Sequence, residues 1–129
     1  MHEVAVIAGY LAAALVNLIP VVAVVSRARL EALYGVSVAT AEMELLLRHR
    51  ALLFGIVAAL LLLAAARPEL RAVAGVLGLL SMLGWVVLAA LTGAESAALE
   101  RVTRVDIVAS ALLGVALAVH LLRTTSAGP

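Results

Sequence analysis

Four long apolar stretches follow one another along the chain, at about residues 4–25, 47–66, 69–91 and 102–122. Each is close to the roughly 20 apolar residues with which an α-helix crosses a bilayer. A more polar, amphipathic connection of about residues 26–46 separates the first two stretches. The pattern predicts an all-α fold, with one domain over residues 1–129 in which four transmembrane helices form an antiparallel bundle.

Several residues indicate where these helices begin and end. The second stretch is short for a membrane span unless its helix begins near Ala41, with Thr40 as the N-cap. Gly35 is the expected stop of a helical pattern that continues past Pro20 from the first stretch. Pro68 opens the third stretch, where its missing N–H removes no hydrogen bond. The connection before it is short, so we expect the second and third helices to form an antiparallel hairpin.

The composition excludes most classes of soluble protein. The chain is 66% hydrophobic and 13% charged, with a mean hydropathy of +1.22. A soluble domain is about 45–50% apolar and about 25% charged, so a cytosolic enzyme and a disordered tail are both excluded. The net charge of +1 gives no basic excess for a nucleic-acid partner. Cysteine is absent, which excludes disulfides and thiolate chemistry.

Arginine residues are distributed unequally between the two ends of the predicted bundle. Short loops rich in basic residues stay on the cytoplasmic side of a membrane. We therefore expect the arginine-rich end to be cytoplasmic and both termini to lie outside. This six-arginine end carries Arg27, Arg29, Arg48, Arg50, Arg101 and Arg104, whereas the opposite end carries three arginines, Arg67, Arg71 and Arg123.

Polar residues of chemical interest gather at the six-arginine end. Asp106 is the strongest signal, because a carboxylate in lipid costs about 2.5–3.5 kcal/mol and must face protein, water or a partner. Its neighbours on its own helix are not cationic, so an ion pair with Arg48 or Arg50 across the bundle is the first expectation. A ligand or ion site made by the same residues, and snorkelling to the lipid headgroups, are the alternatives. The residues of this predicted site are Asn17, Tyr34, Arg48, His49, Arg50, Trp85 and Asp106.

Two of these residues also have plain structural interpretations. Histidine is a common proton carrier in proteins, so His49 could serve as one, but its two flanking guanidinium groups disfavour the charged form. Asn17 could hydrogen-bond the Val16 carbonyl, which Pro20 frees.

His2 and His120 lie toward the other end, so no metal or cofactor site is expected. No nucleophile and base are paired in the sequence, which disfavours an enzyme.

Small residues recur at helical spacing and predict close helix packing. Membrane helices associate through such stripes and through polar contacts. The stripes serve either the bundle itself or a homo-oligomer with a second copy of the chain. They comprise Ala5, Gly9, Ala13 and Asn17 in the first stretch, Gly75 and Gly78 in the third, and Asp106, Ser110 and Gly114 in the fourth.

The segments LYGV (33–36) and LLLRHRALLFG (45–55) carry a resemblance. With the four-span plan, the chain resembles a family of small bacterial four-helix integral membrane proteins of uncharacterised activity. The resemblance implies an inner-membrane location, hence periplasmic termini, and a special role for Arg48, His49 and Arg50. Small multidrug transporters share the size and span number, but their first span carries a carboxylate where this chain offers only Asn17.

The sequence favours binding of a lipid-like or amphipathic anionic ligand, with membrane lipid as the partner. Arg48 and Arg50 would hold the anionic head, Tyr34 and Trp85 would line the apolar part, and Asp106 would orient the guanidinium groups. One alternative is a non-catalytic structural or accessory subunit that forms oligomers. Another is a small proton-linked transporter that uses Asp106 and His49.

Overall fold

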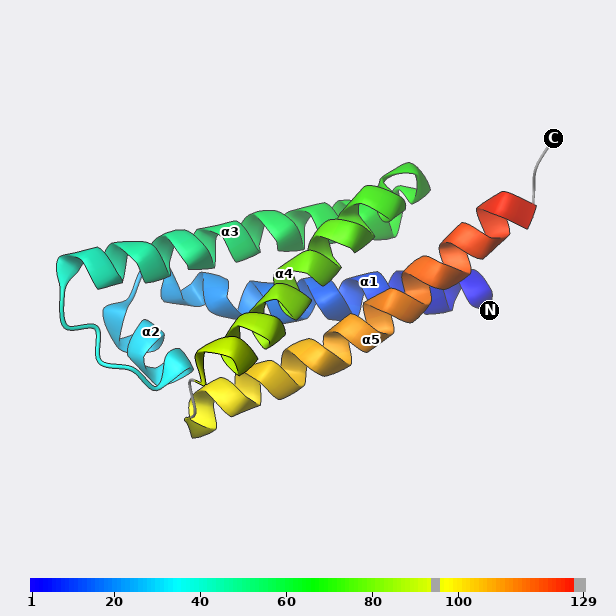
Figure 1. Cartoon of the computed structure of the whole chain (residues 1–129). Helices are drawn as coiled ribbons and strands as arrows, with labels where there is room; N and C mark the ends of the chain where they lie inside the picture. Colours follow the sequence, from blue (N-terminus) through cyan, green and yellow to red (C-terminus); the bar gives the residue numbers. More distant parts are fainter. Residues whose placement is uncertain (94–95, 127–129) are drawn as a thin grey trace.

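The computed structural model describes residues 1–93 and 96–126, which fold into helices joined by short connections (Figure 1). No strand occurs in these residues, and the predicted all-α fold is confirmed. The helices are α1 (His2–Leu18), the 3-10 turn η1 (Ile19–Ala23), α2 (Arg27–Tyr34), α3 (Ala41–Ala66), the 3-10 turn η2 (Pro68–Leu70), α4 (Arg71–Thr92) and α5 (Ala97–Ser126).

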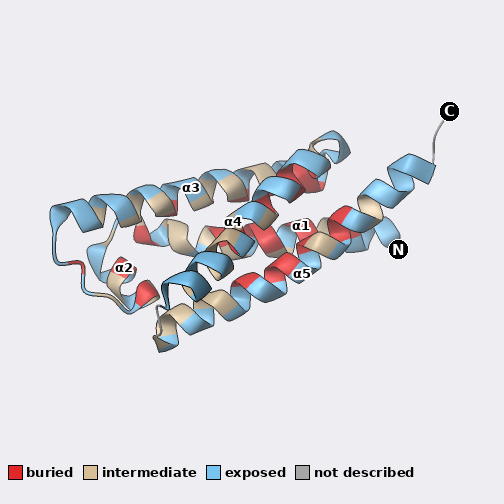
Figure 2. Cartoon of the chain, viewed as in Figure 1, coloured by how far each residue is buried: buried red, intermediate tan, exposed pale blue. Residues whose placement is uncertain are grey.

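Four helical segments are long and apolar enough to cross a membrane, which makes this a multi-pass membrane protein. They are His2–Ala23, Ala41–Ala66, Pro68–Thr92 and Ala97–Ser126. Many large apolar side chains, including Leu46, Leu80 and Leu91, are exposed on the outside of the bundle. Figure 2 shows buried residues on the facing sides of the helices and exposed residues on the outer sides. Such an exterior suits lipid tails rather than water.

The four long helices form a ring of neighbours. α1 packs between α3 and α5, and α4 packs against both of those helices. The start of α1 and the end of α5 lie at one end, whereas α2 lies at the other, the six-arginine end (Figure 1). The main core contains Val6, Tyr10, Ala13, Leu61, Met82 and Leu113.

The small-residue stripe of α1 is used inside the chain. A Cβ atom added to Gly9 would lie 2.6 Å from the Ala116 Cβ atom and 3.0 Å from the Leu112 carbonyl oxygen. Glycine at this position therefore permits the close approach of α1 to α5. Gly114 differs, because a Cβ atom there would meet no described atom within 4 Å.

A side-chain cap marks the start of α3. The helix begins at Ala41, and the Thr40 Oγ1 atom accepts a hydrogen bond of 3.2 Å from the Met43 N–H, as predicted. The first turn carries Glu42 and Glu44, whose charges suit the positive end of the helix dipole. The early start lengthens the apolar segment enough to span a bilayer.

Pro20 tightens the chain into η1 rather than leaving a carbonyl free. The Ile19 N–H donates to the Val16 oxygen, so the backbone itself satisfies that carbonyl. The predicted hydrogen bond from Asn17 to Val16 is therefore wrong. The Asn17 Nδ2 atom instead donates to the Ala13 oxygen, at 2.9 Å.

Arg71 joins three helices at the end of the bundle opposite α2. The residue is only 2% exposed. It donates to the Ala64 and Ala65 carbonyl oxygens at 3.1 and 3.3 Å, and to both carboxylate oxygens of Glu3 at 2.6 and 3.2 Å. The Tyr10 hydroxyl donates to the Arg71 carbonyl oxygen at 2.6 Å. The sequence analysis placed Arg71 at this end of the bundle, within the stretch of residues 69–91, but predicted none of these contacts.

Gly35 ends α2 in the left-handed region, with φ 64°, as the sequence predicts a helix stop there. Gly93 ends α4 with φ 63°. A Cβ atom on Gly35 would lie 2.9 Å from the Ala98 Cβ atom, whereas one on Gly93 would meet no described atom within 4 Å.

We expect Gly35→Ala to lower the free energy of unfolding more than Gly93→Ala does. Both variants carry the cost of a left-handed alanine, about 1–2 kcal/mol, and only Gly35→Ala adds the clash with Ala98. Thermal unfolding in detergent, followed by far-UV circular dichroism, measures both. Equal losses would contradict the close contact between Gly35 and Ala98 of α5.

Candidate functional site

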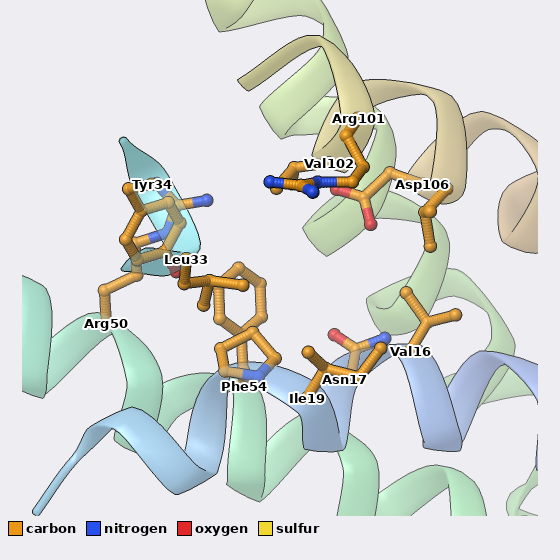
Figure 3. Close-up of a pocket in the computed structure, with 12 residues that line it drawn as sticks. Val16, Asn17, Ile19, Leu33, Tyr34, Arg50, Phe54, Arg101, Val102 and Asp106 are labelled. Carbon is orange, nitrogen blue, oxygen red and sulfur yellow. The ribbon is translucent and has the colours of Figure 1, made fainter. Parts of the chain in front are cut away.

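A pocket of about 230 Å³ opens at the six-arginine end, between α1, η1, α2, α3 and α5 (Figure 3). Its polar lining residues are Asn17, Tyr34, Arg50, Arg101 and Asp106. Figure 3 shows Tyr34 and Arg50 on one side, Arg101 and Asp106 on another, and Asn17 on the α1 wall. The remaining lining residues are apolar: Val16, Ile19, Pro20, Leu33, Phe54, Val102 and Val105.

Aromatic rings from three helices hold Arg50 in place. Its Cζ atom lies 4.0 Å from the ring centroid of Trp85, 5.0 Å from that of Phe54 and 5.2 Å from that of Tyr34. Guanidinium groups are attracted to the faces of such rings. The Trp85 Nε1 atom donates to the Thr103 Oγ1 atom at 3.2 Å, which fixes its ring between α4 and α5. The guanidinium of Arg50 is thus preorganised at the pocket wall.

Asp106 is 7% exposed and lines the same pocket as Arg50. The predicted ion pair with Arg48 or Arg50 is not formed, because neither guanidinium lies within 4.0 Å of the Asp106 carboxylate in the described residues. Arg50 is held by its aromatic neighbours, and Arg48 pairs with Glu44 of its own helix at 2.6 Å. The two arginines therefore have other partners.

The structure brings only part of the predicted site together. Arg48 and His49 do not line the pocket, and His49 is exposed. Trp85 contributes indirectly, through its contact with Arg50. Arg101 lines the pocket but was missed, because the predicted span began at residue 102 and left it in a connection. The helical pattern before residue 102 is the signal that would have placed Arg101 on the helix of Asp106.

Two buried oxygen atoms facing this region have no hydrogen-bond partner among the described residues. They are Asn17 Oδ1 and Tyr34 Oη. Leaving a buried polar atom unsatisfied costs about 1–3 kcal/mol, so such atoms indicate a place for a bound molecule or water.

The protonation of Tyr34 follows from its surroundings in α2. Burial raises the pKa of its phenol above the ordinary value, and Asp106 adds to the increase while Arg50 opposes it. The hydroxyl is therefore protonated near neutral pH and can donate a hydrogen bond into the pocket. Among residues 1–93 and 96–126, no group of three or more His, Asp or Glu side chains is placed to hold a metal ion.

Comparison of the chain with protein-family models, curated proteins and solved structures finds no match. The resemblance to small bacterial four-helix membrane proteins therefore stays a prediction. The interpretation of the pocket rests on its own geometry and chemistry.

Proposed function

We propose that this protein binds an amphipathic ligand whose anionic head lies in the pocket and contacts Arg50 and Arg101. The observation that carries the proposal is that both guanidinium groups line one pocket, while no carboxylate lies within 4.0 Å of either in the described residues. Charged hydrogen bonds to an anion are among the strong ones. Elsewhere in the bundle Arg27, Arg48, Arg71 and Arg104 each pair with a glutamate.

The apolar part of the ligand has a route along the outside of the bundle. Ile19 and Val105 line the pocket and are 52% and 38% exposed. Val16 and Val105 also line an apolar groove of about 300 Å³ against α1 and α5. A lipid whose head group is bound in the pocket would thus place its acyl chain on this apolar groove. The other groove residues are Ala12, Arg104, Val108, Ala109 and Leu112.

In this proposal Arg101 takes the role that the sequence analysis gave to Arg48. Trp85 and Phe54 hold the Arg50 guanidinium, and Tyr34 donates from α2. The protein belongs to a bacterial inner membrane, with the six-arginine end and its pocket on the cytoplasmic side. The distribution of arginine residues and the resemblance support this placement.

We expect Arg101→Gln and Arg50→Gln to weaken binding of dihexanoyl phosphatidylglycerol about tenfold each, because each removes one charged hydrogen bond to the phosphate. Arg48→Gln is the matched control. It removes the same charge from the same helix, two residues before Arg50, at a position that does not line the pocket. Native mass spectrometry of the protein in a neutral detergent measures the bound lipid. Trp85 is the single tryptophan and packs on Arg50, so its fluorescence is a second readout for Arg101→Gln.

Uncharged dihexanoylglycerol is the control for binding through the acyl chains alone. It should bind much more weakly than the phospholipid to the unmodified protein. If both glutamine variants retained phosphatidylglycerol as well as Arg48→Gln does, the proposal would be overturned.

A further inference from the structure

We infer that the head group bound in this pocket carries an ammonium beside its phosphate, as in a phosphoethanolamine head. The inference rests on the proposed function and adds the chemistry of the second half of the head group. Its basis is that hydrogen-bond acceptors without partners lie in the same pocket as the two guanidinium groups.

Asn17 supplies an acceptor whose orientation is fixed. Its side chain is 2% exposed, and its Nδ2 atom is engaged with the Ala13 carbonyl oxygen at 2.9 Å. The Oδ1 atom is therefore the one left without a partner, and in Figure 3 it points into the pocket. An amide oxygen can only accept, so it requires a donor from the ligand.

Asp106 supplies a second acceptor, and one that bears a charge. Its carboxylate is buried at the pocket wall with no ion pair in the described residues. A buried carboxylate without a cationic partner is costly. The chain contains no lysine, so no lysine ammonium can pair with this carboxylate.

A purely anionic head would satisfy the arginines and leave Asp106 facing a like charge. A primary ammonium offers three N–H donors, which can serve Asp106 and Asn17 Oδ1 together while the phosphate contacts Arg50 and Arg101. A choline head keeps the positive charge but has no N–H to donate. The pocket therefore favours ethanolamine over both glycerol and choline as the group esterified to the phosphate.

The phosphoethanolamine group could come from a membrane lipid or from a free metabolite. The groove that shares Val16 and Val105 with the pocket favours the lipid, because it gives an acyl chain an apolar surface beside the head. A competition experiment with free phosphoethanolamine distinguishes these two sources. If the ligand is the lipid, free phosphoethanolamine should displace it only weakly.

The decisive experiment compares dihexanoyl phosphatidylethanolamine, phosphatidylglycerol and phosphatidylcholine on the unmodified protein, by native mass spectrometry and Trp85 fluorescence in a neutral detergent. We expect the ethanolamine lipid to bind about tenfold more tightly than each of the others. Equal or tighter binding of phosphatidylglycerol would overturn the inference. Because this comparison needs no variant, it does not depend on whether a substitution folds.

Asp106→Asn should remove the preference for ethanolamine while retaining phosphatidylglycerol binding. Glu100→Gln is the matched control, because this exposed carboxylate of the same helix pairs with Arg104 at 3.1 Å and should leave the preference intact. A preference that survives Asp106→Asn would also count against the inference. Arginine-dependent binding without head-group preference would refute the inference alone, whereas arginine-independent binding would refute the proposed function.

Discussion

Arg71→Gln is expected to lower the free energy of unfolding by about 3 kcal/mol. Arg71 caps the C-terminus of α3 by donating to the Ala64 and Ala65 carbonyl oxygens, which have no N–H partner within that helix. It also binds the Glu3 carboxylate through both terminal nitrogens. Glutamine is shorter and uncharged, so it cannot make these contacts together. The side-chain hydrogen bonds that join α4 to α1 and to the end of α3 would therefore be lost.

Arg67→Gln is the matched control for this prediction. Arg67 is exposed next to the same helix end and makes no ion pair in the described residues. Its replacement should change stability by about 0.5 kcal/mol or less. Unfolding by sodium dodecyl sulfate, followed by circular dichroism, compares the two variants. Adding Glu3→Gln to Arg71→Gln should cost little more, because both remove the same interaction.

Gly9→Leu is expected to destabilise the bundle by about 3 kcal/mol, at the upper end of the cost of overpacking. Even the first added carbon would lie 2.6 Å from the Ala116 Cβ atom and 3.0 Å from the Leu112 carbonyl oxygen. One of these atoms belongs to the backbone, so no change of side-chain rotamer can relieve the contact. α1 and α5 would have to separate.

Gly114→Leu makes the same change on α5, where an added Cβ atom meets no described atom within 4 Å. It should leave the stability of the single chain nearly unchanged under the same unfolding conditions. Similar losses in the two variants would show that the close approach of α1 to α5 is not what limits substitution at Gly9. If Gly114→Leu left the single chain stable but abolished crosslinked oligomers, this result would support the homo-oligomer that the sequence analysis gave as one of two alternatives.

Hydropathy and capping signals were sufficient to predict the helices. The long apolar stretches predicted four spans, and Thr40 and Gly35 marked helix ends that the structure has at those residues. The capping signals involve residues that are close together in the sequence, so they can be recognised without knowing which helices pack against each other. The role of Arg71 could not be read in this way. Its contacts with Glu3 and with the end of α3 exist only after α1 and α4 have both packed against α3.

The candidate site was predicted in location more than in detail. Asp106, Arg50, Tyr34 and Asn17 do line one pocket. The predicted ion pair was wrong because it treated the arginine only as a charge, whereas its flat guanidinium also stacks on aromatic rings. Three such rings, from Tyr34, Phe54 and Trp85, meet only in the folded chain.

The exposed side chains at the rim of the pocket have a consequence for how a ligand would arrive. Ile19 and Val105 line the pocket, are partly exposed, and belong to the membrane-spanning segments His2–Ala23 and Ala97–Ser126. A lipid could therefore enter sideways by diffusing within one leaflet, with no passage through bulk water and no separation of the long helices. Occupancy would then follow the mole fraction of the lipid in that leaflet, so the protein would respond to the composition of its own membrane.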